Sequence, residues 1–246
     1  MNDIRRVAVV TGAAQGFGQA ISVGFAKRGV DVIGIDLSDC DETGEKVTAI
    51  GARFVGLKAD VSNPESTLLL QQSIDSSFGR CDILVNNAGI YPNKPFAEVD
   101  FALWQRVHRI NLDSQFLMVK AVLQSMIKNH WGRIVNLTSN SLGLAAPGLA
   151  HYMSSKAGVI GFTRGLATDV AEHGITVNAV GPTASLTPGG KAGIDPEVIH
   201  MLAATQAIKR PGTAEDIVGT VMFLSSEDSA WVTGQTIMAD GGLVRL

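Results

Sequence analysis

The sequence predicts an α/β fold, with helices on both faces of a doubly wound, seven-stranded parallel sheet. Short apolar runs rich in β-branched residues alternate with helical stretches, so the order along the chain is strand, helix, strand, helix. Most runs are continuously apolar, which is typical of strands buried on both faces of a parallel sheet. No linker rich in Pro, Gly, Ser or charge divides the chain. We therefore expect residues 1–246 to form a single domain.

The runs can be placed in order along the chain. Strands are predicted at residues 6–11, 30–36, 52–60, 82–87, 132–139, 175–180 and 235–240. Helices are predicted at about residues 16–28, 64–78, 101–128, 152–173 and 213–226. Residues 184–212 are glycine-rich and then helical, as expected of a substrate lid, although a plain surface excursion would read the same way. Ligands bind outside the carboxyl ends of the strands in such sheets, so the segments after the strands should carry the chemistry.

Composition argues against several classes of partner. The formal net charge of -3 and the pI near 5.9 show no basic excess for a nucleic acid or an anionic membrane. The opening MNDIRRVAVVTG has too short an apolar run for a signal peptide or membrane anchor, so a cytoplasmic location is expected. Cys40 and Cys81 lack a second CxxC pair or a histidine at ligand spacing. We expect both to be reduced thiols and no metal site.

The hydrophobic content predicts association. Charged residues make up 17% of the chain, below the roughly 25% that is usual in soluble domains. The helices predicted at 101–128 and 152–173 and the C-terminal QTIMADGGLVRL offer more apolar surface than one small domain needs. We therefore expect a homotetramer.

The segment TGAAQGFG, residues 11–18, follows the first predicted strand and opens a helix. Glycines at 12, 16 and 18 let the backbone approach a pyrophosphate, which the free N–H groups and the dipole of the helix would stabilise. The spacing departs from G-x-G-x-x-G, and glycine turns between strand and helix are common. Asp36, at the end of the second strand, could accept hydrogen bonds from an adenosine ribose, although it could also be a turn residue. Together these residues predict a dinucleotide site.

Asp36 also bears on which dinucleotide binds. A carboxylate repels a 2′-phosphate, and neither Gln15 nor Leu37 offers a positive charge to bind one. NAD is therefore predicted rather than NADP. Asp60 and Val61 follow the third strand, and Asn87-Ala88-Gly89 follows the fourth, so polar groups arrive at the same edge of the sheet.

HYMSSK, residues 151–156, places Tyr152 and Lys156 one helical turn apart. A free phenol has a pKa of about 10 and is a poor base at neutral pH, whereas a nearby positive charge lowers that value. Such a tyrosine could exchange protons with a substrate. On its own the pair is better explained by an amphipathic helix that happens to carry both residues.

In their order and spacing these motifs resemble the short-chain dehydrogenase/reductase family. The likeness is carried by TGAAQGFG, NNAG at 86–89, Asn111, Ser139 and YMSSK at 152–156, and it covers essentially the whole chain. It implies a single-domain Rossmann fold and nicotinamide-dependent hydride transfer, and it agrees with a homotetramer. Stretches such as CDILVNNAGIYP and WGRIVNLTS are similar to NAD-dependent secondary alcohol dehydrogenases of the 1-phenylethanol type.

The resemblance implies roles for the catalytic residues. Tyr152 would be the general acid and base, and Lys156 would lower its pKa and bind the nicotinamide ribose. Ser139 would hydrogen-bond the substrate oxygen as charge develops on it, although a strand-end hydroxyl can also satisfy a local backbone group. Asn111 would kink or hydrate its helix and hold a water that leads from Lys156 to solvent; alone it would be a buried structural amide.

The resemblance and the strand ends together predict the ligand contacts. The cofactor contacts are Gly12, Gln15, Gly16, Phe17, Gly18, Asp36, Leu37, Asp60, Val61, Asn87, Ala88, Gly89, Tyr152, Lys156, Pro182, Thr183 and Thr187. The substrate contacts are Tyr91, Ser139, Asn140, Ser141, Leu144, Leu149, His151 and Met201. One departure is Thr183, which stands where the family commonly has the glycine of a Pro-Gly pair. Thr187 still falls where the family places a hydroxyl near the nicotinamide carboxamide.

The apolar and aromatic character of the expected substrate contacts predicts a small, uncharged, partly hydrophobic secondary alcohol or ketone as substrate. Asn140, Ser141 and Thr183 could instead bind the hydroxyls of a sugar or polyol. A carrier-protein-linked 3-ketoacyl reductase is a further alternative, against which Asp36 argues, because NADPH and a basic docking patch would be expected. A non-catalytic dinucleotide sensor would need neither Tyr152 nor Lys156.

Overall fold

The computed structural model describes residues 5–187 and 194–245, and it confirms the predicted class of fold. Within these residues the main sheet is seven-stranded, in the order β3-β2-β1-β4-β5-β6-β9, and neighbouring strands pair in parallel. The strands are β1 (Val7–Thr11), β2 (Asp31–Asp36), β3 (Phe54–Lys58), β4 (Ile83–Asn86), β5 (Gly132–Leu137), β6 (Ile175–Pro182) and β9 (Thr236–Ala239). The strand order reverses between β1 and β4, which is where such sheets bind ligands.

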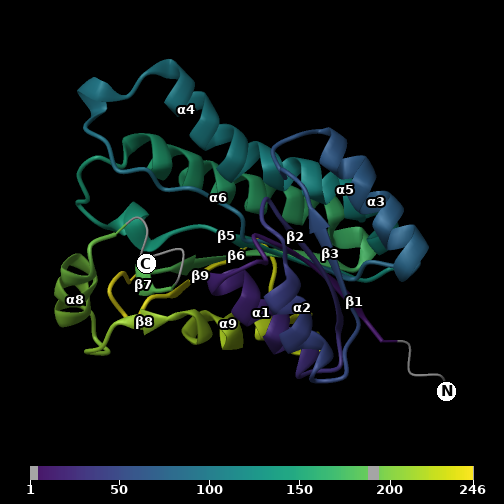
Figure 1. The fold of residues 1–246 in the computed structure, drawn as a ribbon. Coiled ribbons are helices and arrows are strands. Elements are labelled where there is room, and N and C mark those ends of the chain that lie inside the picture. The colour runs from purple at the N-terminus through teal and green to yellow at the C-terminus, as the bar shows by residue number, and fades with distance from the viewer. Residues whose placement is uncertain (1–4, 188–193, 246) are drawn as a thin grey trace.

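Helices cover both faces of the sheet (Figure 1). They are α1 (Gly16–Ala26), α2 (Asp41–Thr48), α3 (Glu65–Ser77), α4 (Phe101–His108), α5 (Ser114–Lys128), α6 (Ala150–Val170), α8 (Pro196–Thr205) and α9 (Val218–Leu224). The layer above the sheet in Figure 1 contains α3, α5 and α6, whose apolar side chains pack with Leu84 and Ile134 in one core. The layer below contains α1 and α9, which pack with Val85 and Val135 in the other. Alternate residues of each strand therefore face opposite cores, as the continuously apolar runs predict.

The helix predicted at 101–128 is interrupted in the structure. A π-helical turn, Arg109–Asp113, separates α4 from α5 and contains Asn111. The extra residue of a π turn loosens the backbone ladder locally, and such turns are frequent at functional sites. The helix predicted to kink or be hydrated at Asn111 therefore has a π-helical turn at that residue.

Two features were not predicted. Helix α2 has the polar sequence DETGEKVT, in which only Thr43 and Val47 are buried, so it carries almost no apolar period. Within residues 184–212, the strand β7 (Ser185–Leu186) pairs in parallel with β8 (Gly212–Thr213), and α8 lies between them in sequence. This pair and α8 lie beyond one end of the main sheet in Figure 1. Residues 188–193 of the expected lid lie outside the described residues, so its role as a lid stays a prediction.

Across residues 5–187 and 194–245, no helix is both long and apolar enough to cross a membrane. The same residues contain no group of three His, Cys, Asp or Glu side chains placed to hold a metal ion.

Candidate active site

The loop between β1 and α1 is shaped to receive a phosphate group. Gly12 and Gly16 have φ values of 66° and 58°, the left-handed region that glycine enters without strain. A Cβ atom on Gly18 would lie 1.9 Å from the carbonyl oxygen of Gly12, so only glycine fits there. The N-cap residue Gln15 makes no side-chain cap, and the first turn of α1 carries no acidic residue. Its N–H groups and helix dipole are therefore available to an anion, and the cradle fits a pyrophosphate.

Asp36 lies beside this loop, where an adenosine ribose would be expected. Its Oδ2 atom accepts a hydrogen bond from the backbone N–H of Ala14 at 3.0 Å, and Oδ1 accepts one from Ser38 N–H at 3.0 Å. The carboxylate is thus fixed at the end of β2 and remains partly exposed. Leu37 follows it with 66% of its surface exposed, so it offers an apolar face and no cation at this point.

The floor of the cradle is built by Thr11 and Asn87. The Thr11 hydroxyl accepts hydrogen bonds from the N–H groups of Asn87 and Ala88, each at 2.9 Å. The Asn87 amide in turn donates to the carbonyl oxygens of Thr11 at 2.8 Å and Gly12 at 3.2 Å. The side-chain amide of Asn87 therefore holds the glycine loop. The expected contact between Asn87 and a cofactor stays a prediction. Thr11, a polar residue at the end of a buried strand, is a functional candidate that the motif reading passed over.

Two other expected cofactor residues have local structural roles. Asp60 accepts hydrogen bonds from both the N–H and the hydroxyl of Ser62, at 2.9 and 2.7 Å, which closes a turn after β3. The side chain of Val61 is 6% exposed and belongs to the core above the sheet. Any contact of Val61 with a cofactor would have to use its backbone.

Ser139 and Tyr152 meet beyond the end of β5. Ser139 begins the 3-10 turn Asn140–Gly143, and its hydroxyl accepts the N–H of Ser141 at 3.1 Å. Tyr152 lies in the first turn of α6, and its ring packs edge-on against Tyr91 with centroids 6.4 Å apart. Burial raises the pKa of the Tyr152 phenol above its usual value, a hydrogen bond with Ser139 acts in the opposite direction, and Tyr91 adds a smaller increase.

Lys156 is enclosed behind Tyr152. Its Nζ atom donates to the carbonyl oxygen of Leu137 at 2.7 Å and lies 5.9 Å from the centroid of the Tyr152 ring. Burial lowers the pKa of Lys156 to about 8. The expectation that Lys156 brings the pKa of Tyr152 below its free value is wrong in this structure, because desolvation of the phenol outweighs a cation that is itself desolvated and turned toward a carbonyl.

Asn111 completes the group from the π turn. Its Oδ1 accepts the N–H of Ile90 at 2.8 Å, and its Nδ2 donates to the carbonyl oxygen of Ile90 at 2.9 Å and to the Ser155 hydroxyl at 3.0 Å. A Cβ on Gly89 would lie 3.1 Å from Asn111 Oδ1 and 3.5 Å from Lys156 Nζ. The side chain of Asn111 is therefore fully engaged in holding the loop after β4 against α6, and a water relay through it stays a prediction.

The predicted substrate contacts divide into two groups. Tyr91, Leu144 and Leu149 are partly buried, and Met201 on α8 is 63% exposed. Asn140 and His151 instead turn to the protein. The Asn140 amide donates to Asp240 at 3.2 Å, and His151 Nε2 is 2.8 Å from the carbonyl oxygen of Pro92. Asp240, 100 residues further along the chain, had no local signal that could have linked it to the site.

Two hydroxyls at this edge of the sheet differ from the others in lacking a described hydrogen-bond partner. The Oγ atom of Ser141 and the Oγ1 atom of Thr183 are buried and have no hydrogen-bond partner among the described residues. Thr183 follows Pro182 at the end of β6, and its methyl carbon faces Gly212. Thr187 lies across the glycine loop, because a Cβ on Gly16 would meet Thr187 Cβ at 3.6 Å. These positions bring the segment after β6 over both the cofactor cradle and the turn that follows Ser139.

A parallel sheet with an anion cradle at its switch point, and a serine, a tyrosine and a lysine grouped beyond the end of β5, defines a class of nucleotide-dependent oxidoreductase. The comparisons with known proteins agree. The family model adh_short_C2, described as enoyl-(acyl carrier protein) reductase, matches residues 12–244. The 3-oxoacyl-(acyl-carrier-protein) reductase FabG of Vibrio cholerae is 39% identical over 245 residues, 99% of either chain. The 2-dehydro-3-deoxy-D-gluconate 5-dehydrogenase of Dickeya dadantii is 37% identical over 96% of this chain and 94% of its own.

Solved structures give the same result. A protein of Sinorhizobium meliloti 1021 described as a short-chain alcohol dehydrogenase superposes with a TM-score of 0.90 at 35% identity, over 97% of this chain and 96% of that one. Levodione reductase superposes with a TM-score of 0.90 at 30% identity, over 96% of each chain. The chain therefore belongs to the short-chain dehydrogenase/reductase family, and it is an oxidoreductase of the nicotinamide-dependent kind. The finer likeness to 1-phenylethanol dehydrogenases is not among these matches.

Proposed function

We propose that the protein is an NAD-dependent dehydrogenase of a small, uncharged, partly hydrophobic secondary alcohol, working in reverse as a ketone reductase. The observation that carries the reaction type is the group formed by Ser139, Tyr152 and Lys156, in which Lys156 Nζ lies 5.9 Å from the centroid of the Tyr152 ring and donates to Leu137 at the end of β5. A bound nicotinamide would supply the hydride acceptor or donor. The residues of the chain would position the substrate oxygen and move its proton.

Tyr152 is the proposed proton acceptor during alcohol oxidation. Its phenol lies at the rim of the site and is only partly buried, whereas Lys156 lies behind it and is 4% exposed. In the proposed complex the substrate hydroxyl would meet Tyr152 and Ser139, and Lys156 would lie behind the tyrosine. Ser139 would donate to or accept from the substrate oxygen, since one of its lone pairs is already used by Ser141 N–H. Lys156, whose Nζ atom lies 5.9 Å from the centroid of the Tyr152 ring, would bind the nicotinamide ribose.

Asp36 supports NAD as the cofactor. The carboxylate is held by Ala14 and Ser38, so it cannot swing away from a 2′-phosphate without breaking two hydrogen bonds. No lysine or arginine stands at positions 14–17 or 37–39 to offset it. Discrimination against NADP would then rest on repulsion between two anions at short range.

The apolar rim supports the substrate class. Tyr91, Leu144 and Leu149 are partly buried around Tyr152, and these side chains favour an uncharged substrate with a hydrophobic portion.

The second candidate is a 3-oxoacyl thioester reductase. The observation that favours it is the similarity to carrier-protein reductases from several bacteria at 37–39% identity. The Sinorhizobium meliloti protein described as a short-chain alcohol dehydrogenase is 35% identical. The similarity to a sugar-acid dehydrogenase, together with the unpartnered hydroxyls of Ser141 and Thr183, favours a hydroxylated substrate in the same way. A dinucleotide sensor is disfavoured, because all four catalytic side-chain types are present and three of them are buried together.

One experiment separates these candidates. Purified protein is assayed with NAD and a panel of secondary alcohols and polyols, and with NADH or NADPH and a 3-oxoacyl thioester, by absorbance of the reduced cofactor. We expect the highest kcat/KM with NAD and a free secondary alcohol. A higher kcat/KM for the thioester, or for NADPH, would replace the proposal with the second candidate. No turnover of any substrate by a protein that still binds NADH would favour the sensor.

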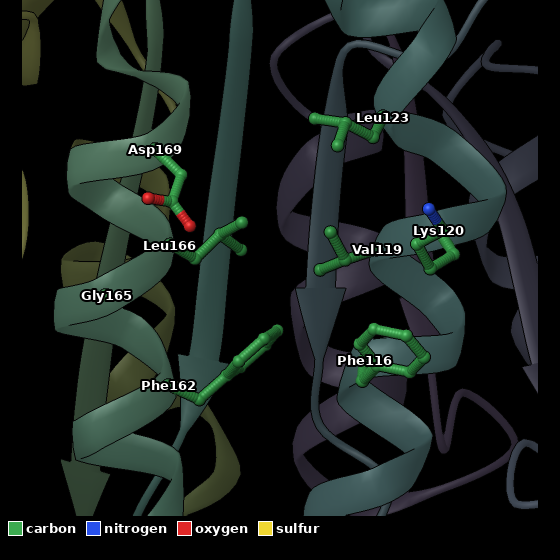
Figure 2. Close-up of a pocket in the computed structure, with 8 residues that line it drawn as sticks. All are labelled: Phe116, Val119, Lys120, Leu123, Phe162, Gly165, Leu166 and Asp169. Atoms are coloured by element: carbon green, nitrogen blue, oxygen red, sulfur yellow. The ribbon is translucent and has the colours of Figure 1, made fainter.

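We further propose that the enzyme is a homotetramer in which the outer faces of α5 and α6 contact a second copy. Figure 2 shows Phe116 and Leu123 of α5 and Phe162 and Leu166 of α6 on the two sides of an apolar groove, with Lys120 and Asp169 among them. Phe116 is 54% exposed, which is costly on a free surface. Lys120 lies on α5 and Asp169 on α6, so a two-fold axis can bring Lys120 of one copy next to Asp169 of the other. A monomeric mass for the wild-type protein by light scattering at micromolar concentration would contradict this; a smaller assembly for Leu166→Glu alone would support it.

A further inference from the structure

A buried carboxylate follows the last strand of the sheet, and the reaction as described does not use it. Asp240 is 3% exposed. Its Oδ2 accepts hydrogen bonds from Asn140 Nδ2 at 3.2 Å and from Val244 N–H at 2.8 Å. Its Oδ1 accepts the N–H groups of Gly242 at 3.0 Å and Leu243 at 3.2 Å. Each oxygen thus has two donors, and an anion bonded in this way is rigidly placed.

On one side Asp240 braces the turn that presents the catalytic serine. Asn140 is the first residue of the 3-10 turn that begins at Ser139, and the Ser139 hydroxyl bonds within this same turn. Val244 packs on the turn as well, because a Cβ on Gly143 would lie 2.4 Å from Val244 Cγ1. The position of the Ser139 hydroxyl therefore depends on a segment 100 residues away in sequence.

On the other side the same segment holds the chain that leaves α8. Gly241 and Gly242 both adopt left-handed conformations, with φ values of 70° and 75°. The carbonyl oxygen of Gly241 accepts the N–H of Ile208 at 2.8 Å. A Cβ on Gly242 would lie 2.9 Å from Ala207 Cβ, so only glycine allows this approach. Residues 240–244, which we name the C-terminal clasp, therefore touch both the serine turn and the end of the predicted lid.

We propose that Asp240 is a positioning residue for the reaction, which acts by fixing the turn of Ser139 and linking it to the end of α8. The proposal rests on the function proposed above for Ser139 and Tyr152. A hydroxyl that must meet both the phenol and the substrate oxygen tolerates little displacement, and an error of about 1 Å can cost on the order of a hundredfold in rate. The cofactor cradle lies at β1 and β2, and the clasp makes no described contact with it.

The test compares Asp240→Asn with a control on a matched aspartate. The amide keeps the shape of the side chain but offers one acceptor oxygen where the carboxylate offers two, so at least one donor loses its partner. For the full-length Asp240→Asn enzyme in its native assembly, we expect kcat to fall by about tenfold or more. The dissociation constant for NADH should stay within about twofold of the wild-type value. Asp216→Asn is the control, because Asp216 is exposed, is held by Arg210 and Thr213, and also lies near residue 212. Its kcat should not change.

A structural role is separated from a positioning role by a Ser139→Ala background. If Asp240 acts through Ser139, Asp240→Asn should have little further effect on the residual kcat of Ser139→Ala. Equal proportional losses in both backgrounds would overturn the proposal, as would an unchanged kcat in Asp240→Asn. If Asp240→Asn does not fold, Asn140→Ala removes the same bond from the other partner and is expected to lower kcat, with NADH binding retained. A fully active Ser139→Ala would instead refute the proposed function of the site itself.

Discussion

The strand ends on the two halves of the sheet treat their hydroxyl groups differently. At the end of β1 the Thr11 hydroxyl accepts two backbone N–H groups, and Asn87 beside it donates to two carbonyl oxygens. Beyond β5 and β6, the hydroxyls of Ser141 and Thr183 are buried without a partner among the described residues. The floor of the cofactor cradle is therefore held by its own hydrogen bonds. The turns beyond β5 and β6 instead contain buried hydroxyls that have no described partner.

This difference separates what the family shares from what distinguishes its members. A cradle whose floor is fixed by internal hydrogen bonds keeps one shape whether or not a ligand is bound, and it suits a cofactor common to many enzymes. Buried hydroxyls without partners each carry a cost of about 1–3 kcal/mol, which a ligand with a matching group would remove. We infer that specificity for the substrate is encoded beyond β5 and β6.

The largest expected effect is that of Tyr152→Phe, which removes only the phenolic oxygen. We expect kcat for alcohol oxidation to fall by about a thousandfold, within the range typical of a lost general acid or base. NADH affinity should change little, because the cradle at β1 and β2 is untouched. The measurement is steady-state turnover with NAD beside a fluorescence titration with NADH. Substantial turnover by a folded variant, free of wild-type contamination, would mean that the proton goes elsewhere.

Lys156→Met tests the electrostatic cost of the buried lysine. The folded pKa of about 8 lies below the usual 10.5, so the unfolded chain binds more protons between these two values. The penalty is complete below pH 8 and is relieved as the pH rises toward 10.5. Its size is on the order of 3 kcal/mol. Lys156→Met should thus raise the free energy of unfolding relative to wild type by more at pH 7 than at pH 10. We expect the variant to lose activity and affinity for NADH.

The measurement is urea unfolding of both proteins at the two pH values. Taking the difference between the proteins removes the contributions of other groups that titrate in alkali, such as the cysteines. A difference in stability that does not vary with pH would show that Lys156 is not desolvated as described.

A matched pair of isosteric variants tests the comparison between the halves directly. Thr11→Val leaves the N–H groups of Asn87 and Ala88 without an acceptor, and we expect it to lower the free energy of unfolding by about 2 kcal/mol. Thr183→Val removes a hydroxyl that has no described partner, so the protein should be unchanged or up to about 1 kcal/mol more stable. Chemical denaturation without ligand measures both. If both variants lowered the free energy of unfolding by the same amount, the two halves of the sheet would not differ in the way described above.

The smallest effect is expected for Asp36→Asn. The amide keeps an oxygen to accept hydrogen bonds from the loop but loses the charge, so the loop should persist while the repulsion of a 2′-phosphate falls. We expect the ratio of kcat/KM for NAD over NADP to narrow by about tenfold. The wild-type enzyme provides the second check, since equal or better use of NADP by it would reject the assignment of NAD. Asp39→Asn, on an exposed carboxylate that pairs with Lys58, is the control.

Most of the fold was accessible from sequence because buried parallel strands leave a strong signal. The run VAVV in β1 is apolar at every position, and most such runs are followed by a turn and a helix. Helix α2 was missed because only Thr43 and Val47 face the core, so its sequence has no apolar stripe. The strands β7 and β8 were missed because two residues each are too few to show a period.

The candidate site was predictable where its residues belong to a motif and not where partners are distant in sequence. Tyr152, Lys156 and the glycines of the cradle lie at fixed spacings within single elements. Nothing near Asn140 indicates that Asp240 will hold it, so a side chain expected to face the substrate faces the protein instead. The prediction that the pKa of Tyr152 lies below its free value was wrong for a related reason. The sequence shows that a cation is close to the phenol but not that both groups are desolvated.

The two thiols have a practical consequence for following motion in this enzyme. Burial and nearby aspartates raise the pKa of Cys40 to about 11, and burial raises that of Cys81 still further. Because the thiolate is the reactive form, maleimide dyes at neutral pH should leave both residues unmodified in the native state. A cysteine introduced at position 201, where Met201 is 63% exposed on α8, would then be the single labelled site. Fluorescence from that one dye could report how α8 moves as each ligand binds, with no need to remove the native thiols first.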